Sequence, residues 1–350
     1  MTYHSMYGAA DFHPATRDFF RGKTVAVTGG TGFIGSHVVE QLLALGARCI
    51  VLSRTGRPGF LEHVTDRVEI RTCDLESLCQ TREGIGGATV VLNLAATVAG
   101  LEYNAAHPAS IFDGNMRMFL NAIRASQEAG VERFLVTSSA CVYPRFCSLP
   151  TPEEEGFVGE PEPTNSGYGW AKRMQEYLGG QYAKEFGLPV AIARPYNAYG
   201  PRDDFDPSTS HVIPALIRKA FETPSDGFNV WGDGSHSRSF LYVDDFARGL
   251  VEVAARYPVA AAVNLGADEE ITIGDVAREV GRLVSEVRGA KVEPLFQPAG
   301  LTGQPRRRCD TSKGMRELGF QSRVPFREGL RRMVQWYAEH AHHPVSSDSQ

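Results

Sequence analysis

Short apolar runs alternate along the first half of the chain with longer stretches whose apolar residues have helical spacing. Such runs, rich in Val, Ile and Leu, are typical of strands buried on both faces. We expect strands at Val25–Thr28, Cys49–Leu52, Val68–Arg71, Val90–Leu94, Phe134–Thr137 and Val190–Arg194. We expect helices between them, at Gly35–Leu45, Ala109–Ala129 and Gly169–Phe186. The alternation predicts an α/β fold with a doubly wound, mostly parallel sheet covered by helices on both faces.

The alternation ends after Pro195, where Pro, Gly, Asp and Ser crowd residues 200–210 and shorter elements follow. We therefore expect a smaller C-terminal α/β lobe for substrate, with Phe240–Val243 returning to the main sheet as a strand. In chain order, the predicted parts are an N-terminal extension at 1–22, the main domain at 23–195 with 239–265 returning to it, the smaller lobe at 196–238 and 266–340, and a frayed tail at 341–350.

The first predicted strand ends in a glycine-rich turn that runs from Gly29 to Gly35, and a helical pattern follows at once. In such a turn Gly29 permits the tight bend, Gly32 lets a ligand approach the backbone, and Gly35 lets the helix pack against the strand. Backbone N–H groups and the positive end of the helix dipole then face a diphosphate. The motif predicts a Rossmann-type dinucleotide-binding domain, with Phe33 and Ile34 also at the cofactor.

The end of the second predicted strand bears on the choice between NAD and NADP. In this fold an acidic residue about 20 positions beyond the glycines binds the ribose 2′-hydroxyl of NAD. Ser53 and Arg54 stand there instead of a carboxylate. A hydroxyl followed by a guanidinium suits the 2′-phosphate of NADP, which we favour, although a solvated loop charge also explains Arg54. Asp74, which Leu75 follows, is expected either to bind the adenine, with Leu75 beside it, or to cap the next helix.

Composition narrows the class of partner. The net charge of −5 gives no electrostatic reason to expect nucleic acid or a membrane surface, and no apolar run is long enough to span a bilayer. The six cysteines form no Cys-x-x-Cys pair, so we expect neither a metal site nor a disulfide framework. Residues 1–21 lack the apolar segment of a signal peptide, and a cytoplasmic location is the simplest expectation.

Tyr168 and Lys172 are four residues apart at the start of a predicted helix, so their side chains share one helical face. A lysine ammonium near a phenol favours the phenolate, and Tyr168 is then able to act as acid or base towards a sugar hydroxyl. Ser139 lies about thirty residues upstream, at the end of a central strand, where its hydroxyl can bond the same substrate oxygen. We predict that these three residues form a catalytic triad.

Together with the glycine motif, this triad resembles the extended short-chain dehydrogenase/reductase family that modifies nucleotide sugars. The resemblance runs from Lys23 to Trp336 and includes the segments Arg194–Pro201 and Trp231–Gly234. It implies an NAD(P)-dependent enzyme with a nucleotide-sugar substrate, and a homodimer formed through two helices. Beyond the glycine motif and the triad, the resemblance implies cofactor contacts at Leu94, Ala95, Ala96 and Pro195, and substrate contacts at Asn115, Asn197, Val212, Arg238 and Arg306. Asn197 and the two arginines would hold the diphosphate, unless the arginines are only surface charges.

Two further residues narrow the chemistry within the family. Cys141 stands where GDP-fucose synthases and GDP-mannose 3,5-epimerases carry a catalytic cysteine, and Ala140 and Cys141 replace the Asp-Glu pair of 4,6-dehydratases. The segment Asp206–Arg218 resembles the one that carries the epimerase histidine of GDP-fucose synthases, which assigns His211 as the partner of Cys141. A thiol and an imidazole suit proton removal and return beside a ketone near neutral pH. The alternative is that Cys141 is a small buried hydrophobe and His211 caps a helix.

We therefore predict an epimerase that inverts C3 and/or C5 of a 4-keto nucleotide sugar, with reduction at C4 by NADPH as a further step. One alternative is a 4-epimerase or 4-ketoreductase without proton chemistry at C3 or C5, and a remote one is a non-catalytic NAD(P)-binding sensor. The nucleotide and the sugar stay open, because the motifs mix those of two branches of the family. The predicted helix Ala109–Ala129 carries apolar residues that form either the dimer face or part of the core: Ile111, Met116, Met118, Phe119 and Ile123.

Overall fold

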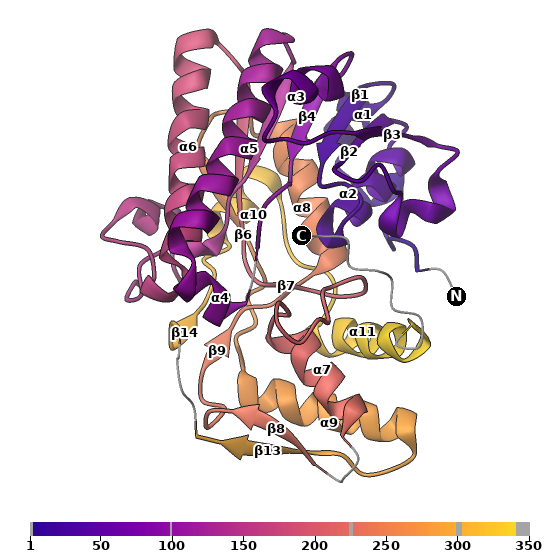
Figure 1. The fold of residues 1–350 in the computed structure, drawn as a ribbon, viewed down its shortest axis with the longest axis vertical. Helices are drawn as coiled ribbons and strands as arrows, with labels where there is room; N and C mark the ends of the chain where they lie inside the picture. Colours follow the sequence, from indigo (N-terminus) through magenta and orange to yellow (C-terminus); the bar gives the residue numbers. More distant parts are fainter. Residues whose placement is uncertain (1–2, 99, 224–226, 299–302, 341–350) are drawn as a thin grey trace.

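The computed structural model describes residues 3–98, 100–223, 227–298 and 303–340. Its centre is a seven-stranded parallel sheet in the order β11-β6-β5-β4-β1-β2-β3 (Figure 1). The strands of this sheet are β1 (Thr24–Thr28), β2 (Arg48–Ser53), β3 (Val68–Thr72), β4 (Val90–Asn93), β5 (Arg133–Thr137), β6 (Val190–Pro195) and β11 (Ala262–Leu265). The six strands expected from the sequence are present, and the predicted α/β, Rossmann-type fold is confirmed.

Helices cover both faces of the sheet because alternate residues of each strand point to opposite sides. Val25 and Val27 of β1 face one apolar cluster, whereas Ala26 faces another. The first cluster includes residues of α1 (Pro14–Phe20), α2 (Phe33–Ala44), α8 (Val243–Arg256) and α10 (Ser312–Leu318). The second is covered by α3 (Leu78–Ile85), α5 (Pro108–Glu128) and α6 (Ser166–Phe186). The long helices α5 and α6 lie side by side (Figure 1).

Most of the apolar residues expected at a dimer face of α5 belong to the protein's own interior. Ile111, Phe119 and Ile123 are buried, and Met118 packs against the core beside them. The core alternative is therefore correct for these four residues, and a homodimer stays a prediction.

One strand prediction is wrong. Phe240–Val243 does not enter the main sheet: β10 (Leu241–Tyr242) pairs with β7 (Ala198–Tyr199) in a separate two-stranded sheet. Val243 already begins α8, which packs against β5 and β6. The edge position beside β6 is taken by β11 instead. A short apolar run predicts a strand, but it does not say which neighbour the strand pairs with.

A smaller C-terminal lobe is drawn at the bottom of Figure 1. Its core joins α7 (Val212–Glu222), α9 (Ile273–Arg288), α11 (Phe326–His340) and the paired strands β8 (Gly227–Trp231) and β13 (Glu293–Gln297). A three-stranded sheet lies next to it, made of β12 (Ile271–Thr272), β9 (Ser237–Arg238) and β14 (Arg306–Arg307).

The short helices are α4 (Leu101–Ala106), η1 (Ala9–Asp11), η2 (Gly59–Val64), η3 (Ala140–Val142), η4 (Glu153–Phe157) and η5 (Pro163–Asn165). The domain boundaries remain a prediction, and the predicted tail lies outside the described residues.

Residues 3–22, expected to be an extension, pack into the main domain. Tyr7, Phe12 and Phe20 are buried in the same apolar cluster as α2 and α8. Their polar neighbours bond to α8: the Tyr7 hydroxyl donates to Asp245 at 2.8 Å, and Thr16 Oγ1 donates to Glu252 at 2.6 Å. This N-terminal arm is thus part of the core. Among the described helices, none is long and apolar enough to cross a membrane.

Candidate active site

The glycine turn after β1 is tightly packed at Gly29 and Gly35. Gly29 has φ +65°, the left-handed region that favours glycine. A Cβ on Gly35 would lie 2.1 Å from the Gly29 carbonyl oxygen, and a Cβ on Gly29 would lie 3.1 Å from Ala95 Cα. Gly32 occupies the N-cap position of α2, so the first free N–H groups of that helix follow it. The backbone geometry fits the diphosphate of a dinucleotide at this helix end.

The loop after β4 closes over the glycine turn. The backbone N–H groups of Leu94 and Ala95 both donate to Thr28 Oγ1 at 2.9 Å. Ala96 follows them and is half-buried. These bonds place the three residues beside Gly29, where a cofactor contact is predicted for them.

Asn115 in α5 does not fit the predicted contact with substrate. Its amide is buried and binds the backbone: Nδ2 donates to Thr97 O at 3.0 Å and to Ile111 O at 2.7 Å, and Oδ1 accepts from Thr97 N at 3.1 Å. The side chain is used to hold the loop after β4 against α5. The structure therefore favours a positioning role for Asn115.

The end of β2 carries the residues that bear on the cofactor's 2′ position. Ser53 is buried, with Oγ 3.5 Å from Thr55 Oγ1, and Arg54 is exposed. Asp74 is exposed and accepts the N–H of Glu76 at 3.0 Å. The helix-cap alternative for Asp74 is wrong, because Ser77 caps α3 by accepting from Gln80 N.

Tyr168 and Lys172 lie on the first turns of α6, with the Lys172 ammonium 5.3 Å from the centre of the Tyr168 ring. Lys172 is buried and donates to Thr137 O at 2.8 Å and to Gln175 Oε1 at 3.1 Å. Ser139 caps η3 by accepting the N–H of Cys141 at 3.2 Å, and its hydroxyl also bonds the Tyr168 phenol. The structure thus brings the three predicted triad residues together.

The protonation of this pair differs from our expectation. Burial raises the pKa of Tyr168 above that of an ordinary phenol, and the charge of Cys141 adds to the rise, while the Ser139 hydrogen bond opposes it. Burial also lowers the pKa of Lys172 to about 8, against the charges of Cys141 and Glu176. In this environment burial outweighs the effect of the ammonium. Tyr168 is therefore held protonated, which suits a proton donor.

A buried ion pair joins α6 to the central sheet. Arg194 of β6 binds Glu176 through two bonds, Nε to Oε1 at 2.7 Å and Nη2 to Oε2 at 2.6 Å. Ser138 also donates to Glu176, and the Arg194 guanidinium lies 5.4 Å from the centre of the Tyr143 ring. This pair connects the strand ends at the triad to the helix that carries it.

Replacing Glu176 by glutamine should lower the free energy of unfolding by about 3–5 kcal/mol, because Arg194 would keep a buried charge without its partner. Urea denaturation followed by circular dichroism measures this loss. Glu128→Gln is the matched control, since Glu128 also binds an arginine (Arg82) through two bonds, but at the surface. An equal loss in both variants would contradict the assigned importance of the buried pair.

Cys141 lies beside the triad and next to two arginines. Its carbonyl oxygen is 2.5 Å from where a Cβ on Gly169 would stand, so η3 lies directly against the start of α6. Arg307 Nη1 is 3.9 Å from Cys141 Sγ. Arg307 is paired across β14 and β9 with Arg238. Burial, together with the neighbouring Arg307 charge, lowers the pKa of Arg238 to about 9. Two guanidinium groups held this close attract an anion.

Arg306, the predicted phosphate ligand, points to the other side of β14. It forms a two-bond ion pair with Glu270, at 2.8 and 2.7 Å, and is exposed. Successive residues of a strand face opposite ways, so its neighbour Arg307 is the one that faces Cys141. The predicted role of Arg306 therefore does not fit, and the sequence analysis missed Arg307. The run of arginines at 306–308 was the available signal.

His211 stands at the N-cap of α7 without a side-chain cap bond, so the structure does not support the helix-cap alternative. Its ring is 55% exposed and lies 4.0 Å from Asp203. Partial burial opposes protonation, but the carboxylates of Asp203 and Asp204 outweigh it and raise the pKa of His211. The hydrogen bonds and ion pairs of the described residues connect Cys141 to Arg307 and His211 to Asp203, and none connects the two to each other. The predicted partnership of Cys141 and His211 stays a prediction.

Five other predicted contact residues are placed as follows. Asn197 Nδ2 donates to Ser239 O at 2.8 Å, which ties the segment after β6 to that before β10. Pro195 ends β6 opposite Leu265, and Val212 begins α7 and packs on the lobe core. Phe33 and Ile34 begin α2 and pack partly against the same lobe core. Their roles towards cofactor and substrate stay predictions.

Comparison with known proteins gives consistent results. The model of the NAD dependent epimerase/dehydratase family matches residues 25–266. A probable GDP-L-fucose synthase 1 of Oryza sativa is 33% identical over 91% of this chain and 93% of its own length. A dTDP-4-dehydro-6-deoxy-D-allose reductase of Streptomyces bikiniensis is 32% identical over 93% of this chain and 99% of its own.

Solved structures of similar proteins have the same fold. A GDP-L-fucose synthetase of Naegleria fowleri bound to NADP is 27% identical with a TM-score of 0.77, covering 92% of this chain and 94% of its own. A UDP-glucose 4-epimerase of Thermotoga maritima with UDP-glucose is 26% identical with a TM-score of 0.79, covering 91% of this chain and 99% of its own.

Proposed function

This chain belongs to the NAD dependent epimerase/dehydratase family, and we propose that it is a nucleotide-sugar epimerase/reductase of the GDP-L-fucose synthase type. Its substrate would be a GDP-linked 4-keto-6-deoxy-D-mannose, because L-fucose differs from that sugar by inversion at C3 and C5 and reduction at C4. The observation that carries the proposal is the place of Cys141, next to the Tyr168–Lys172 pair and to Arg307. Relatives named GDP-L-fucose synthase support the choice of sugar.

The ketone at C4 makes the hydrogens on C3 and C5 acidic. The Cys141 thiolate, beside the Arg307 guanidinium, would remove a proton from one face of the sugar ring. His211, at the start of α7 in the other lobe, would return a proton from the opposite face. Tyr168 and Ser139 would donate hydrogen bonds to the C4 oxygen and stabilise the enolate.

The reduction at C4 uses the same residues. NADPH, bound at the glycine turn, would supply the hydride. Tyr168, held protonated by its burial, would give its proton to the C4 oxygen as the alcohol forms. Lys172 would then stabilise the phenolate that remains. We favour NADP over NAD because Ser53 ends β2 and the exposed Arg54 follows it, where NAD enzymes need a carboxylate.

The arginine pair would bind the diphosphate of the nucleotide sugar. Replacing Arg307 by methionine should raise KM about 10- to 100-fold, because a charge-assisted hydrogen bond contributes roughly 1.5–3 kcal/mol. Arg306→Met is the matched control: it removes the same side chain from the opposite face of β14, where Glu270 binds it. Steady-state kinetics measures both. A larger rise in KM for Arg306→Met than for Arg307→Met would contradict this assignment.

A second candidate is a 4-ketoreductase that leaves C3 and C5 unchanged. The similarity to a dTDP-4-dehydro-6-deoxy-D-allose reductase over nearly the whole chain favours it. The two functions differ in whether protons of the sugar ring exchange with solvent.

Incubation in deuterated water distinguishes them. With the GDP-linked 4-keto sugar and no reductant, the proposed enzyme should place deuterium at C3 and C5, as seen by NMR and mass spectrometry. Addition of NADPH should then give the reduced sugar with the label retained. Normal oxidation of NADPH without carbon-bound deuterium would instead establish the 4-ketoreductase.

A further inference from the structure

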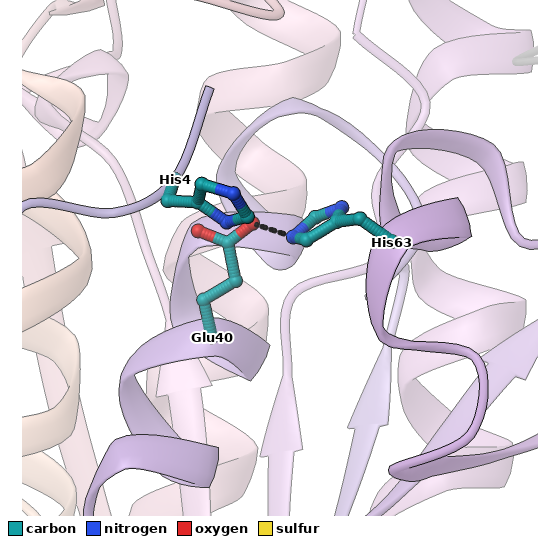
Figure 2. A group of neighbouring side chains, drawn as sticks. All are labelled: His4, Glu40 and His63. Atoms are coloured by element: carbon teal, nitrogen blue, oxygen red, sulfur yellow. Dashed lines mark ion pairs between the residues drawn. The ribbon is translucent and has the colours of Figure 1, made fainter. Parts of the chain in front are cut away.

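Two histidines and a glutamate from three separate segments converge at one edge of the main domain (Figure 2). His4 belongs to the N-terminal arm, Glu40 lies on α2, and His63 lies in η2. One potential ligand atom from each residue lies within 4.8 Å of those of the other two. No short sequence motif joins these positions, so the cluster exists only in the folded chain.

The ligand atoms have a suitable separation for one ion. His63 Nε2 is 2.8 Å from Glu40 Oε1. The His4 and His63 rings are 4.7 Å apart between centres and inclined at 76°, an edge-to-face arrangement. Ligand atoms around a tetrahedral zinc ion lie roughly 3.3 Å apart, since each is about 2.0 to 2.1 Å from the metal. The separation of His63 Nε2 from Glu40 Oε1 is shorter than that value, and the 4.8 Å within which all three ligand atoms lie is longer.

The surroundings hold the Glu40 side chain in place. Its side chain is 8% exposed, and that of His63 is 13% exposed. Glu40 Oε2 accepts the N–H of Ser5 at 2.5 Å, and Oε1 accepts from Arg202 Nη2 at 2.6 Å. His63 Nε2 is buried and, among the described residues, makes no well-aligned hydrogen bond despite its closeness to Oε1. In the neutral imidazole a ring nitrogen of this kind is able to bind a metal ion.

We propose that His4, Glu40 and His63 form a binding site for a divalent cation of the zinc class, with water completing the coordination. Two imidazoles and one carboxylate are a donor set that suits zinc and neighbouring transition metals better than magnesium. The Arg202 guanidinium shares Oε1 and opposes a dication, so the ion competes with an existing charge. This site is separate from the triad and does not depend on the proposed function.

The cation would hold the N-terminal arm against the main domain. His4 lies among the residues of the arm that bond α8, because Tyr3 and Ser5 on either side of it both donate to Asp244. A metal bridge from His4 to α2 and η2 would add a third attachment in the same place. Binding to the folded state alone would slow the opening of the arm.

Zinc binding by the full-length protein, purified without a polyhistidine tag, tests the proposal. After chelator treatment and dialysis, calorimetric titration with ZnSO₄ should show one site per chain, and titration with MgCl₂ should show none. His63→Gln and His4→Gln should each weaken zinc binding at least about tenfold. His13→Asn is the matched control, because His13 lies on the same arm outside the cluster and asparagine retains its helix-capping acceptor.

Hydrogen exchange of residues 3–12 gives a second readout that needs no catalysis. Zinc should slow exchange there in the wild type and in His13→Asn, and not in His63→Gln. Zinc affinity that is unchanged in both His4→Gln and His63→Gln, or no slowing of exchange in the wild type at saturating zinc, would overturn the proposal. Because neither result involves substrate, the proposed function is unaffected by either.

Discussion

Replacing Tyr168 by phenylalanine should lower kcat for reduction of the 4-keto sugar about 10³-fold. The phenol hydroxyl is the group that bonds Ser139 and would give a proton to the C4 oxygen, and loss of a general acid typically costs 10²–10⁴-fold. The ring and its contact with Lys172 remain in the variant, so NADP binding should change little. Oxidation of NADPH measures kcat, and fluorescence titration measures cofactor binding.

Tyr177→Phe is the control for this variant. Tyr177 lies on the same helix α6, but its ring is 54% exposed and away from the triad. It should retain wild-type kcat. A Tyr168→Phe enzyme with more than about a tenth of wild-type kcat would show that another group donates the proton, and the assignment of Tyr168 would fail.

Replacing Cys141 by serine should reduce the rate of deuterium incorporation at the sugar carbons by about 10³-fold while reduction at C4 continues. A serine hydroxyl is far less acidic than a thiol, so it does not become the charged base that proton removal requires. Tyr168, Lys172 and Ser139 are untouched, so NADPH should still reduce the unepimerised ketone. The product should then keep the original configuration at C3 and C5, as NMR coupling constants will show.

Cys147→Ser controls for the loss of a thiol in the same segment. Cys147 is half-buried, six positions further along, with Sγ 3.2 Å from Thr151 Oγ1. It should exchange deuterium at the wild-type rate. Equal exchange in Cys141→Ser and the wild type would remove the thiol from the mechanism and leave the 4-ketoreductase as the better description.

These two variants separate the steps because each changes one atom and leaves the rest of its side chain: Tyr168→Phe removes the phenol oxygen, and Cys141→Ser exchanges sulfur for oxygen. Tyr168→Phe should lose reduction at C4. It should retain deuterium exchange only as far as the Ser139 hydroxyl alone stabilises the enolate. Loss of exchange with reduction retained is expected of Cys141→Ser. Identical effects of both variants on both steps would point to a common structural disturbance.

The amino-acid sequence determined the larger features of this protein. Apolar runs that alternate with stretches of helical periodicity were enough to predict the six strands, because a strand buried on both faces must be apolar along its length. The glycines of the first turn were equally informative, since Gly29 and Gly35 stand where a Cβ would collide with backbone. Tyr168 and Lys172 could be paired from the sequence because residues four positions apart on a helix share a face.

Tertiary structure alone decided the features that depend on register and on long-range pairing. Whether Arg306 or Arg307 faces Cys141 follows from the pairing of β14 with β9, and a shift of one residue would exchange the two. Which strand completes the sheet beside β6 depends on the path of α8. The meeting of His4, Glu40 and His63 depends on the docking of the N-terminal arm. Local sequence determines local geometry, whereas these contacts join residues far apart in the chain, and only the packed core brings them together.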